Sequence, residues 1–334
     1  MCVVQRHTEL ENVWVRAEEL VKRALGRASY TALKEEIYSN EPKVDAYTLP
    51  LVSGLAQLYA LSGDKSRIGL AKKMIAYIMQ HDAHGSGKFV VHPMVETFNE
   101  ILRAEVREYE EEQAADEDKR VASLDYATSL LDFMLQREEN GFWPNGETVE
   151  LLFRLLFALN PVDIGERAED ILSKIEVRRA YSPHNNIPIS LSTYHRVLRC
   201  WLEAAKREET THAATRAMQL VNRLEVQSTP LFLTDRDVSQ TNLYDISLRP
   251  NVRTYRLVNK ICAETVNADA FPKAVKVAVK VYLKLMATGL EDENGVDREA
   301  LLRCIYKLPP SSEERQRAEI QLRSNTSETL LAAV

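Results

Sequence analysis

The sequence predicts an all-α protein, an α-solenoid of about five helix-turn-helix repeats between half-repeat caps. Three observations predict this fold class. The 334 residues include only 11 Gly and 12 Pro, too few for the many turns of an all-β protein. Leu, Ala, Glu, Arg and Lys, which favour helices, dominate the composition. Finally, a proline-based helix start and an alanine-based apolar stripe both recur along the chain, which favours a repeat array over one compact core.

The first recurring feature is a proline followed, after three residues, by a threonine and usually an aromatic residue. Proline cannot continue a preceding helix, and the threonine hydroxyl can cap free amides of the new helix, so each start predicts a first helix. The starts are Pro93 with Thr97-Phe98-Asn99, Pro144 with Thr148-Val149-Glu150, Pro250 with Thr254-Tyr255-Arg256, Pro188 with Thr193-Tyr194-His195 after one extra residue, and Pro42 with Ala46-Tyr47-Thr48.

The second recurring feature is an apolar stripe of the form Ala-x-x-apolar-apolar-x-x-apolar, which predicts a second helix in every unit. The stripes are Ala71, Met74, Ile75, Ile78; Ala127, Leu130, Leu131, Met134; Ala168, Ile171, Leu172, Ile175; Ala217, Leu220, Val221, Leu224; and Ala278, Val281, Tyr282, Leu285. Two helices with one stripe each cannot bury that surface alone, so we expect the units to stack.

The ends of the chain predict caps for this array. Trp14, Ala17, Leu20 and Val21 form a stripe typical of a second helix, and Asp297 to Tyr306 has the pattern of a first helix. A helix start at Ser311 to Glu314 precedes a polar tail. The predicted organisation is therefore N-terminal capping helices over 1–41, a solenoid over 42–290, and a capping helix with a polar tail over 291–334.

The net charge of −6 counts against strong, nonspecific binding to nucleic acid. Acids outnumber bases between about Glu100 and Glu176, whereas the stretch from Arg249 to Lys284 is basic. Any RNA contact is therefore expected in the C-terminal half.

The cysteine spacing and the hydropathy of the chain exclude several further classes of protein. The four cysteines lie far apart without a Cys-x-x-Cys pair, which predicts neither a zinc knuckle nor a disulfide framework and favours a reducing compartment. No stretch reaches the roughly 18 apolar residues of a membrane span. The helical pattern begins near Glu11, too early for a preceding signal or transit peptide, so none is expected within this chain.

A proline, a Thr-aromatic-Asn helix and then an Ala-rich helix ending near Met together resemble the pentatricopeptide repeat family. Pro93 to Met134 carries the resemblance best, and it covers about Pro42 to Gly289. It implies a right-handed solenoid that binds single-stranded or ribosomal RNA in a mitochondrion or plastid. The units are longer than the family's repeat, as in algal or protist organellar members, because inserts lie at Asp82 to Val91, Glu108 to Arg120, Arg178 to Ile187 and Glu225 to Leu248.

The resemblance also implies which residues face RNA. In the family, the residue after the aromatic and the residue after the next unit's proline together face one base. These pairs are Thr48 with Met94, Asn99 with Asn145, Glu150 with Ser190, and His195 with Asn251. Asn99 with Asn145 is the usual kind of pair and implies a pyrimidine, whereas Arg256 has no identifiable partner.

Basic residues on the first helices of the last two units are candidates for phosphate contacts, with simple solvation as the alternative. They are Arg196, Arg199, Arg249, Arg253, Arg256 and Lys260. The predicted RNA-binding residues are therefore Asn99, Asn145, His195, Asn251, Arg196, Arg253, Arg256 and Lys260.

Other candidate chemistry has a simpler explanation. His81, His84 and His92 lack the cysteine or paired carboxylates that would complete a metal site. The acidic run from Glu108 to Asp118 is expected to be a solvated insert, and the aromatic residues of the helix starts are expected to pack in the core rather than stack on bases. No catalytic or nucleotide-binding motif occurs, so the sequence predicts no enzyme, cofactor, metal or small-molecule substrate.

Two functional hypotheses remain. The first is an organellar RNA-associated protein that contacts RNA through the basic C-terminal units. The second is a structural adaptor, a subunit of an organellar ribosome or another large assembly, that binds mainly protein. The insert from Glu225 to Leu248 is apolar enough to serve as a docking segment for such a partner.

Overall fold

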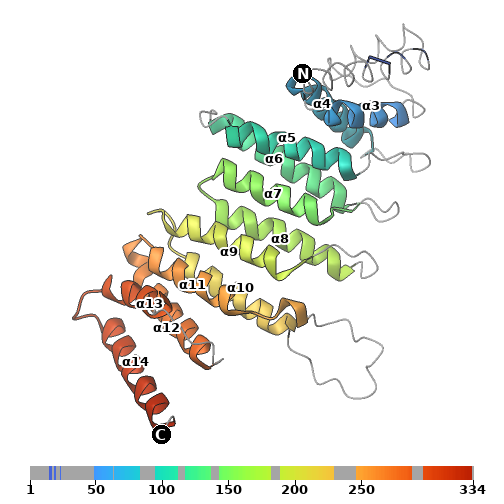
Figure 1. Cartoon of the computed structure of the whole chain (residues 1–334). Coiled ribbons are helices and arrows are strands. Elements are labelled where there is room, and N and C mark those ends of the chain that lie inside the picture. Colours follow the sequence, from blue (N-terminus) through green and yellow to red (C-terminus); the bar gives the residue numbers. More distant parts are fainter. Residues whose placement is uncertain are drawn as a thin grey trace, which may run out of the picture. The chain divides into compact units, whose positions relative to one another are not determined.

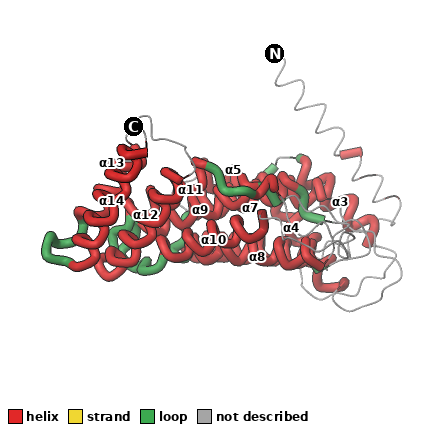
Figure 2. The backbone as a smooth tube through the Cα atoms, turned by 90° about the horizontal axis from the view of Figure 1, so that it is seen from below, coloured by secondary structure: helices red, strands yellow, loops and turns green. Residues whose placement is uncertain are grey.

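All regular secondary structure in the described part of the chain is helical. The computed structural model describes residues 15, 16, 19, 23, 49–62, 64–82, 95–111, 117–136, 143–181, 189–228, 246–287 and 296–332. From residue 49 on, these ranges contain twelve α-helices and two short 3-10 helices; residues 15, 16, 19 and 23 are also helical, and no described residue belongs to a strand (Figure 2). The predicted all-α class is confirmed.

The helices follow one another in pairs along the sequence (Figure 1). Their bounds are α3 Leu49–Leu61, α4 Lys65–Asp82, α5 Val95–Glu111, α6 Glu117–Leu135, α7 Gly146–Leu159, α8 Ile164–Tyr181, α9 Leu191–Ala205, α10 Ala213–Ser228, α11 Val252–Glu264, α12 Phe271–Ala287, α13 Val296–Tyr306 and α14 Glu313–Ala332. The 3-10 helices are η2 Ile246–Leu248 and η3 Ala268–Ala270. Odd-numbered α-helices are the first helices of their pairs, and even-numbered ones are the second.

The threonine of the recurring start closes a reciprocal hydrogen-bond box at the beginning of the first helix. At α11, the Asn251 side chain accepts from the Thr254 backbone N–H (3.1 Å), and the Thr254 hydroxyl accepts from the Asn251 backbone N–H (3.1 Å). Asn145 and Thr148 repeat both bonds at α7, at 2.9 and 3.2 Å. The threonine is thus the third helical residue, and an asparagine before the helix is the cap.

Contacts divide the chain into two compact units. One comprises Met1–Leu159 and Val177–Pro188, and the other comprises Asn160–Glu176 and Ile189–Val334. In the first unit α3 packs against α4 and α5, and α5 packs against α7. In the second unit α9 packs against α11 and α11 against α13, while α10 packs against α12 and α12 against α14. Within each unit, first helices therefore contact first helices.

The predicted apolar stripes form the core. Every stripe residue of α4, α6, α8 and α10 is buried, and in α12 only Tyr282 departs from this, being half-buried. The alanines that open the stripes are fully buried, as expected where helices approach closely. Phe98, Tyr194 and Tyr255 are also buried, so the prediction that these aromatic residues pack in the core is confirmed.

One glycine permits a close helix contact in the second unit. A Cβ added at Gly165 of α8 would lie 2.4 Å from the ring of Trp201 on α9. Trp201 is fully buried, and its indole N–H donates to the Glu169 carboxylate at 3.2 Å. The absence of a side chain at Gly165 thus lets the indole lie directly against the α8 backbone.

The C-terminal segment 291–334 contains two helices. α13 agrees with the predicted first helix, and α14 begins at Glu313, where the sequence predicted a helix start. α14 continues to Ala332 and packs against α12 and α13. A second helix therefore follows α13 where the sequence predicted a polar tail.

Several predicted features lie outside the described residues. They include most of the N-terminal segment 1–41 with Trp14, the start at Pro42 with Thr48, Met94, Pro188, His84, His92 and most of the insert from Glu225 to Leu248. Among the helices that are described, none has both the length and the apolar run needed to cross a bilayer.

Candidate nucleic-acid interface

The structure brings the predicted base-reading pair Asn99 and Asn145 into direct contact. Asn99 is the fifth residue of α5, and its side-chain amide donates to the Asn145 Oδ1 at 3.2 Å. The Thr148 hydroxyl donates to the Asn99 Oδ1 at 2.7 Å. Both polar atoms of the Asn99 side chain thus bond to the start of α7, and Asn99 is only 1% exposed.

His195 repeats this arrangement in the second unit. It is the fifth residue of α9, and its Nε2 lies 2.8 Å from the Thr254 hydroxyl at the start of α11. The Asn251 side chain caps the start of α11 by accepting a hydrogen bond from the Thr254 backbone N–H. Burial, together with the positive charges of the nearby Arg253 and Arg199, lowers the pKa of His195 to about 4. The imidazole is therefore neutral at physiological pH.

Arg256 gives a third example with different chemistry. It is the fifth residue of α11, and its Nε donates to the carboxylate of Asp297 on α13 at 2.9 Å. The Asn259 side chain donates to the Asp297 backbone carbonyl at 2.7 Å. Arg256, for which the sequence identified no partner, is thus paired with the start of the following first helix.

In α5, α9 and α11 the fifth residue therefore connects neighbouring first helices. Asn99, His195 and Arg256 each bond to a residue at or near the start of the next first helix. Asn99 and His195 are buried, so a base could be read there only if it replaced these bonds within the protein. Arg256 differs because its side chain remains 48% exposed in the ion pair.

Basic side chains lie on α9 and α11, and two of them are close to His195. Arg199 and Arg253 both act on the His195 ring electrostatically, so they approach it from two successive first helices. Arg199, Arg253 and Lys260 are exposed, and Arg196 is half-buried. Over α11, a hollow of about 570 Å³ is lined by Asn251, Val252, Arg253, Arg256, Leu257 and Lys260. We call the group Arg196, Arg199, Arg253, Arg256 and Lys260 the basic face.

A second repeated bond set was not foreseen from the sequence. The Glu176 carboxylate near the end of α8 accepts from the Tyr194 hydroxyl and from Arg223. Glu225 of α10 accepts in the same way from the Tyr255 hydroxyl at 3.0 Å and from Lys284 at 2.5 Å. Burial and the bond to Glu225 raise the pKa of Tyr255 to about 12.

The signal for this bond set was present in the repeat spacing. Glu176 and Glu225 each stand eight residues after the alanine that opens their stripe, Ala168 and Ala217. Each glutamate thus ties a second helix to the tyrosine of the next first helix.

The described residues include no group of three His, Cys, Asp or Glu side chains placed to hold a metal ion. Cys200, Cys262 and Cys304 are buried free thiols, and burial raises the pKa of Cys304 to about 12. Such a thiol is protonated at neutral pH and is a poor nucleophile.

Comparison with known proteins gives no match. No protein-family model matches the chain, and no curated protein or solved structure is significantly similar to it.

Proposed function

We propose that the chain is a right-handed α-solenoid of the pentatricopeptide type that binds single-stranded RNA through the basic face. The contacts of α9 with α11 and of α11 with α13 support a stacked array in the second unit. One observation carries the functional part: Arg199 and Arg253 approach His195 from two neighbouring first helices, and Arg199, Arg253 and Lys260 are all exposed. An organellar location, in a mitochondrion or plastid, belongs to the proposal through the resemblance.

Local charge supports this choice of face. Residues 246–264, which include α11, contain four Lys or Arg and one Glu, a local excess of three positive charges in a chain whose net charge is −6. Contacts to phosphates weaken as salt rises and carry no sequence information. The expected RNA binding therefore depends on salt and tolerates changes of RNA sequence. The inward bonds of Asn99 and His195 agree with weak base discrimination.

A salt titration tests the proposal. Fluorescence anisotropy with a single-stranded RNA would compare the protein with a variant carrying Arg199→Ala, Arg253→Ala and Lys260→Ala. Each phosphate contact contributes about 0.7 to the slope of log K against log salt, so the variant slope should be shallower by about 2. A matched control carries Lys119→Ala, Arg303→Ala and Arg317→Ala, which remove the same charge elsewhere.

Two results would contradict RNA binding through this face. One is the absence of RNA affinity at low salt. The other is an equal change of slope in the variant and its control, which would show that only net charge matters.

The second candidate function is a non-catalytic adaptor within an organellar ribosome or another large assembly. The burial of Asn99 and His195 favours it, because their polar atoms serve helix packing rather than a ligand. Gentle isolation followed by mass spectrometry would distinguish the two. Stable co-purification with proteins after nuclease treatment supports the adaptor, and loss of all partners on that treatment contradicts it.

A further inference from the structure

The Arg256 guanidinium is held by a carboxylate that is buried in the protein. Its Nε donates from α11 to the Asp297 Oδ2 on α13 at 2.9 Å. The Arg256 side chain is 48% exposed, whereas the Asp297 side chain is 5% exposed. One carboxylate can engage only one edge of a guanidinium, which carries five N–H donors in a planar fork. The ion pair thus fixes the arginine at the surface while the acid remains buried.

Asp297 is itself fixed by other groups. The fully buried Asn259 side chain donates to the Asp297 backbone carbonyl at 2.7 Å. Asp297 is the second residue of α13, and the partial positive charge at a helix N-terminus favours a carboxylate in the first turn. Arg256 and Asn259 stand three residues apart on α11, so they lie on the same face of that helix. Asp297 is therefore a rigid support for the Arg256 side chain.

Arg256 lines the hollow of about 570 Å³ over α11. Arg253 and Lys260 line it as well, about one turn before and one turn after Arg256, so the three cations share one face of α11. None of the described residues that line this hollow is acidic. An anion in the hollow would therefore meet three positive charges, one of which is oriented in advance.

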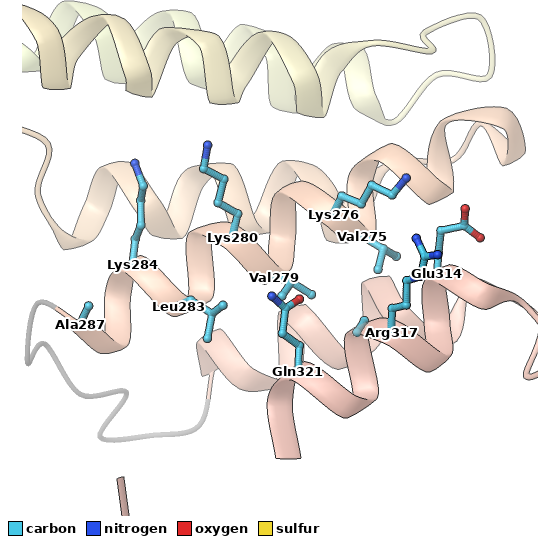
Figure 3. Close-up of a pocket in the computed structure, with 11 residues that line it drawn as sticks. Val275, Lys276, Val279, Lys280, Leu283, Lys284, Ala287, Glu314, Arg317 and Gln321 are labelled. Carbon is cyan, nitrogen blue, oxygen red and sulfur yellow. The ribbon is translucent and has the colours of Figure 1, made fainter. Parts of the chain in front are cut away.

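The lysines of α12 carry charge without such support. Lys276 and Lys280 extend from α12 beside a second hollow, which lies between α12 and α14 (Figure 3). Both are exposed, and neither forms an ion pair with a described residue. A lysine ammonium on its flexible stem is not oriented before it binds, whereas a guanidinium held by a carboxylate is. The hollow over α11 therefore combines positive charge with a fixed donor geometry.

We propose that Asp297 is a positioning residue for RNA binding, which holds Arg256 at the hollow over α11 so that its guanidinium receives an RNA phosphate. The inference rests on the proposed binding of RNA through the basic face. A guanidinium matches the oxygens of a phosphate in a planar, bidentate geometry. Ordering this long side chain in advance removes part of the entropy cost of binding. The opposing effect, repulsion between Asp297 and the phosphate, is screened by salt.

These two effects of Asp297 have opposite signs, so Asp297→Asn separates them. If Asp297 acted only through its charge, removing that charge would tighten RNA binding. Because Asp297 positions Arg256, we expect about three- to tenfold weaker binding by fluorescence anisotropy, the range for one long side chain that must be ordered on binding. Glu299→Gln is the matched control, since it makes the same charge change at a 73% exposed side chain of α13. It should leave RNA affinity unchanged or slightly raised.

Substitutions of the arginine test the same contact from the other side. Arg256→Lys keeps the charge but loses the planar fork, so it should weaken RNA binding by a similar factor. Arg256→Ala should weaken it more than Lys280→Ala, which removes the same charge from α12. In an Asp297→Asn background, Arg256→Ala should cost less affinity than in the unsubstituted protein, because the arginine there is no longer held in place.

A measurement without RNA reports the order of the side chain directly. NMR relaxation of the Arg256 Nε–H should show a lower order parameter in Asp297→Asn and an unchanged one in Glu299→Gln. Circular dichroism should confirm that each variant folds. If Asp297→Asn does not fold, the RNA affinity of Arg256→Lys decides the question.

Three results would overturn the positioning role. They are tighter RNA binding by Asp297→Asn, equal affinities of Arg256→Lys and the unsubstituted protein, and an unchanged order parameter of Arg256 in Asp297→Asn. Failure of the proposed function looks different, because the protein would then lack RNA affinity at low salt or the basic-face variant and its control would show equal slopes. A normal slope change together with tighter binding by Asp297→Asn contradicts the role of Asp297 alone.

Discussion

The Asn99 amide donates to the Asn145 side chain that caps the following first helix, so the two residues that would face one RNA base instead bond to each other. The contact explains why polar side chains are tolerated at both of these positions. Asn99 is 1% exposed, and a buried amide without partners would be costly. It also leads to the first prediction.

Asn99→Ala should destabilise the protein by about 1 to 3 kcal/mol, because the Thr148 hydroxyl and the side-chain oxygen of Asn145 both lose a partner in a buried site. The midpoint of urea unfolding measures the change. Asn222→Ala, at an exposed position of α10, is the control and should stay within about 0.5 kcal/mol. Equal effects of the two substitutions would show that the Asn99 bonds add nothing to stability.

His195 should make stability depend on pH. Its pKa is about 4 in the folded protein and 6.5 when the ring is unperturbed, so the unfolded chain binds the extra proton first. The contribution of the neutral ring is complete above pH 6.5 and is lost as pH falls from 6.5 towards 4. Thermal unfolding across this window should show a smaller fall in Tm for His195→Gln than for the unsubstituted protein. Parallel curves for the two would argue against this assignment.

Gly165→Ala should destabilise the second unit, because the added methyl would lie 2.4 Å from the Trp201 ring. Overpacking of this kind costs about 1 to 3 kcal/mol. Gly69→Ala in α4 is the matched control, since a Cβ there meets no atom within 4 Å. It should stabilise the protein by about 0.4 to 1 kcal/mol. The midpoint of chemical unfolding, measured by Trp fluorescence, should therefore fall for Gly165→Ala and rise for Gly69→Ala.

The bond between Tyr255 and Glu225 should appear in a double-mutant cycle. Tyr255→Phe removes a hydroxyl that donates to a carboxylate at 3.0 Å and should cost about 1 to 2 kcal/mol. In a Glu225→Gln background the same change should cost less, and the difference is the coupling energy. Tyr306→Phe, at a 59% exposed position, is the control. A coupling energy of zero would contradict the repeated role of Glu176 and Glu225.

The sequence predicted the helices better than it predicted the bonds between them. The alanine stripes and the Pro-x-x-x-Thr starts are local patterns, and they located second helices such as α10 and first helices such as α11. The partnership of Arg256 with Asp297 crosses 41 positions in the sequence. No local spacing marks such a pair, because its separation depends on the length of an intervening insert.

For the same reason, only part of the candidate site could be predicted from the sequence. The repeat alignment placed Asn99 opposite Asn145, and these residues do touch. Whether a polar side chain faces a ligand or a neighbouring helix depends on burial, which composition does not report. The exposure of Arg253 and Lys260 and the inward bonds of Asn99 and His195 therefore required three-dimensional information.

The differing chemistry of the fifth residues has a consequence for assembly during folding. An amide meets an asparagine cap at one junction, an imidazole meets a threonine at another, and a guanidinium meets an aspartate at a third. A helix pair that docked one position out of place would bury a polar group opposite the wrong counterpart. These junctions thus specify the order of neighbours and disfavour slipped pairings, which uniform leucine contacts between similar helices would allow.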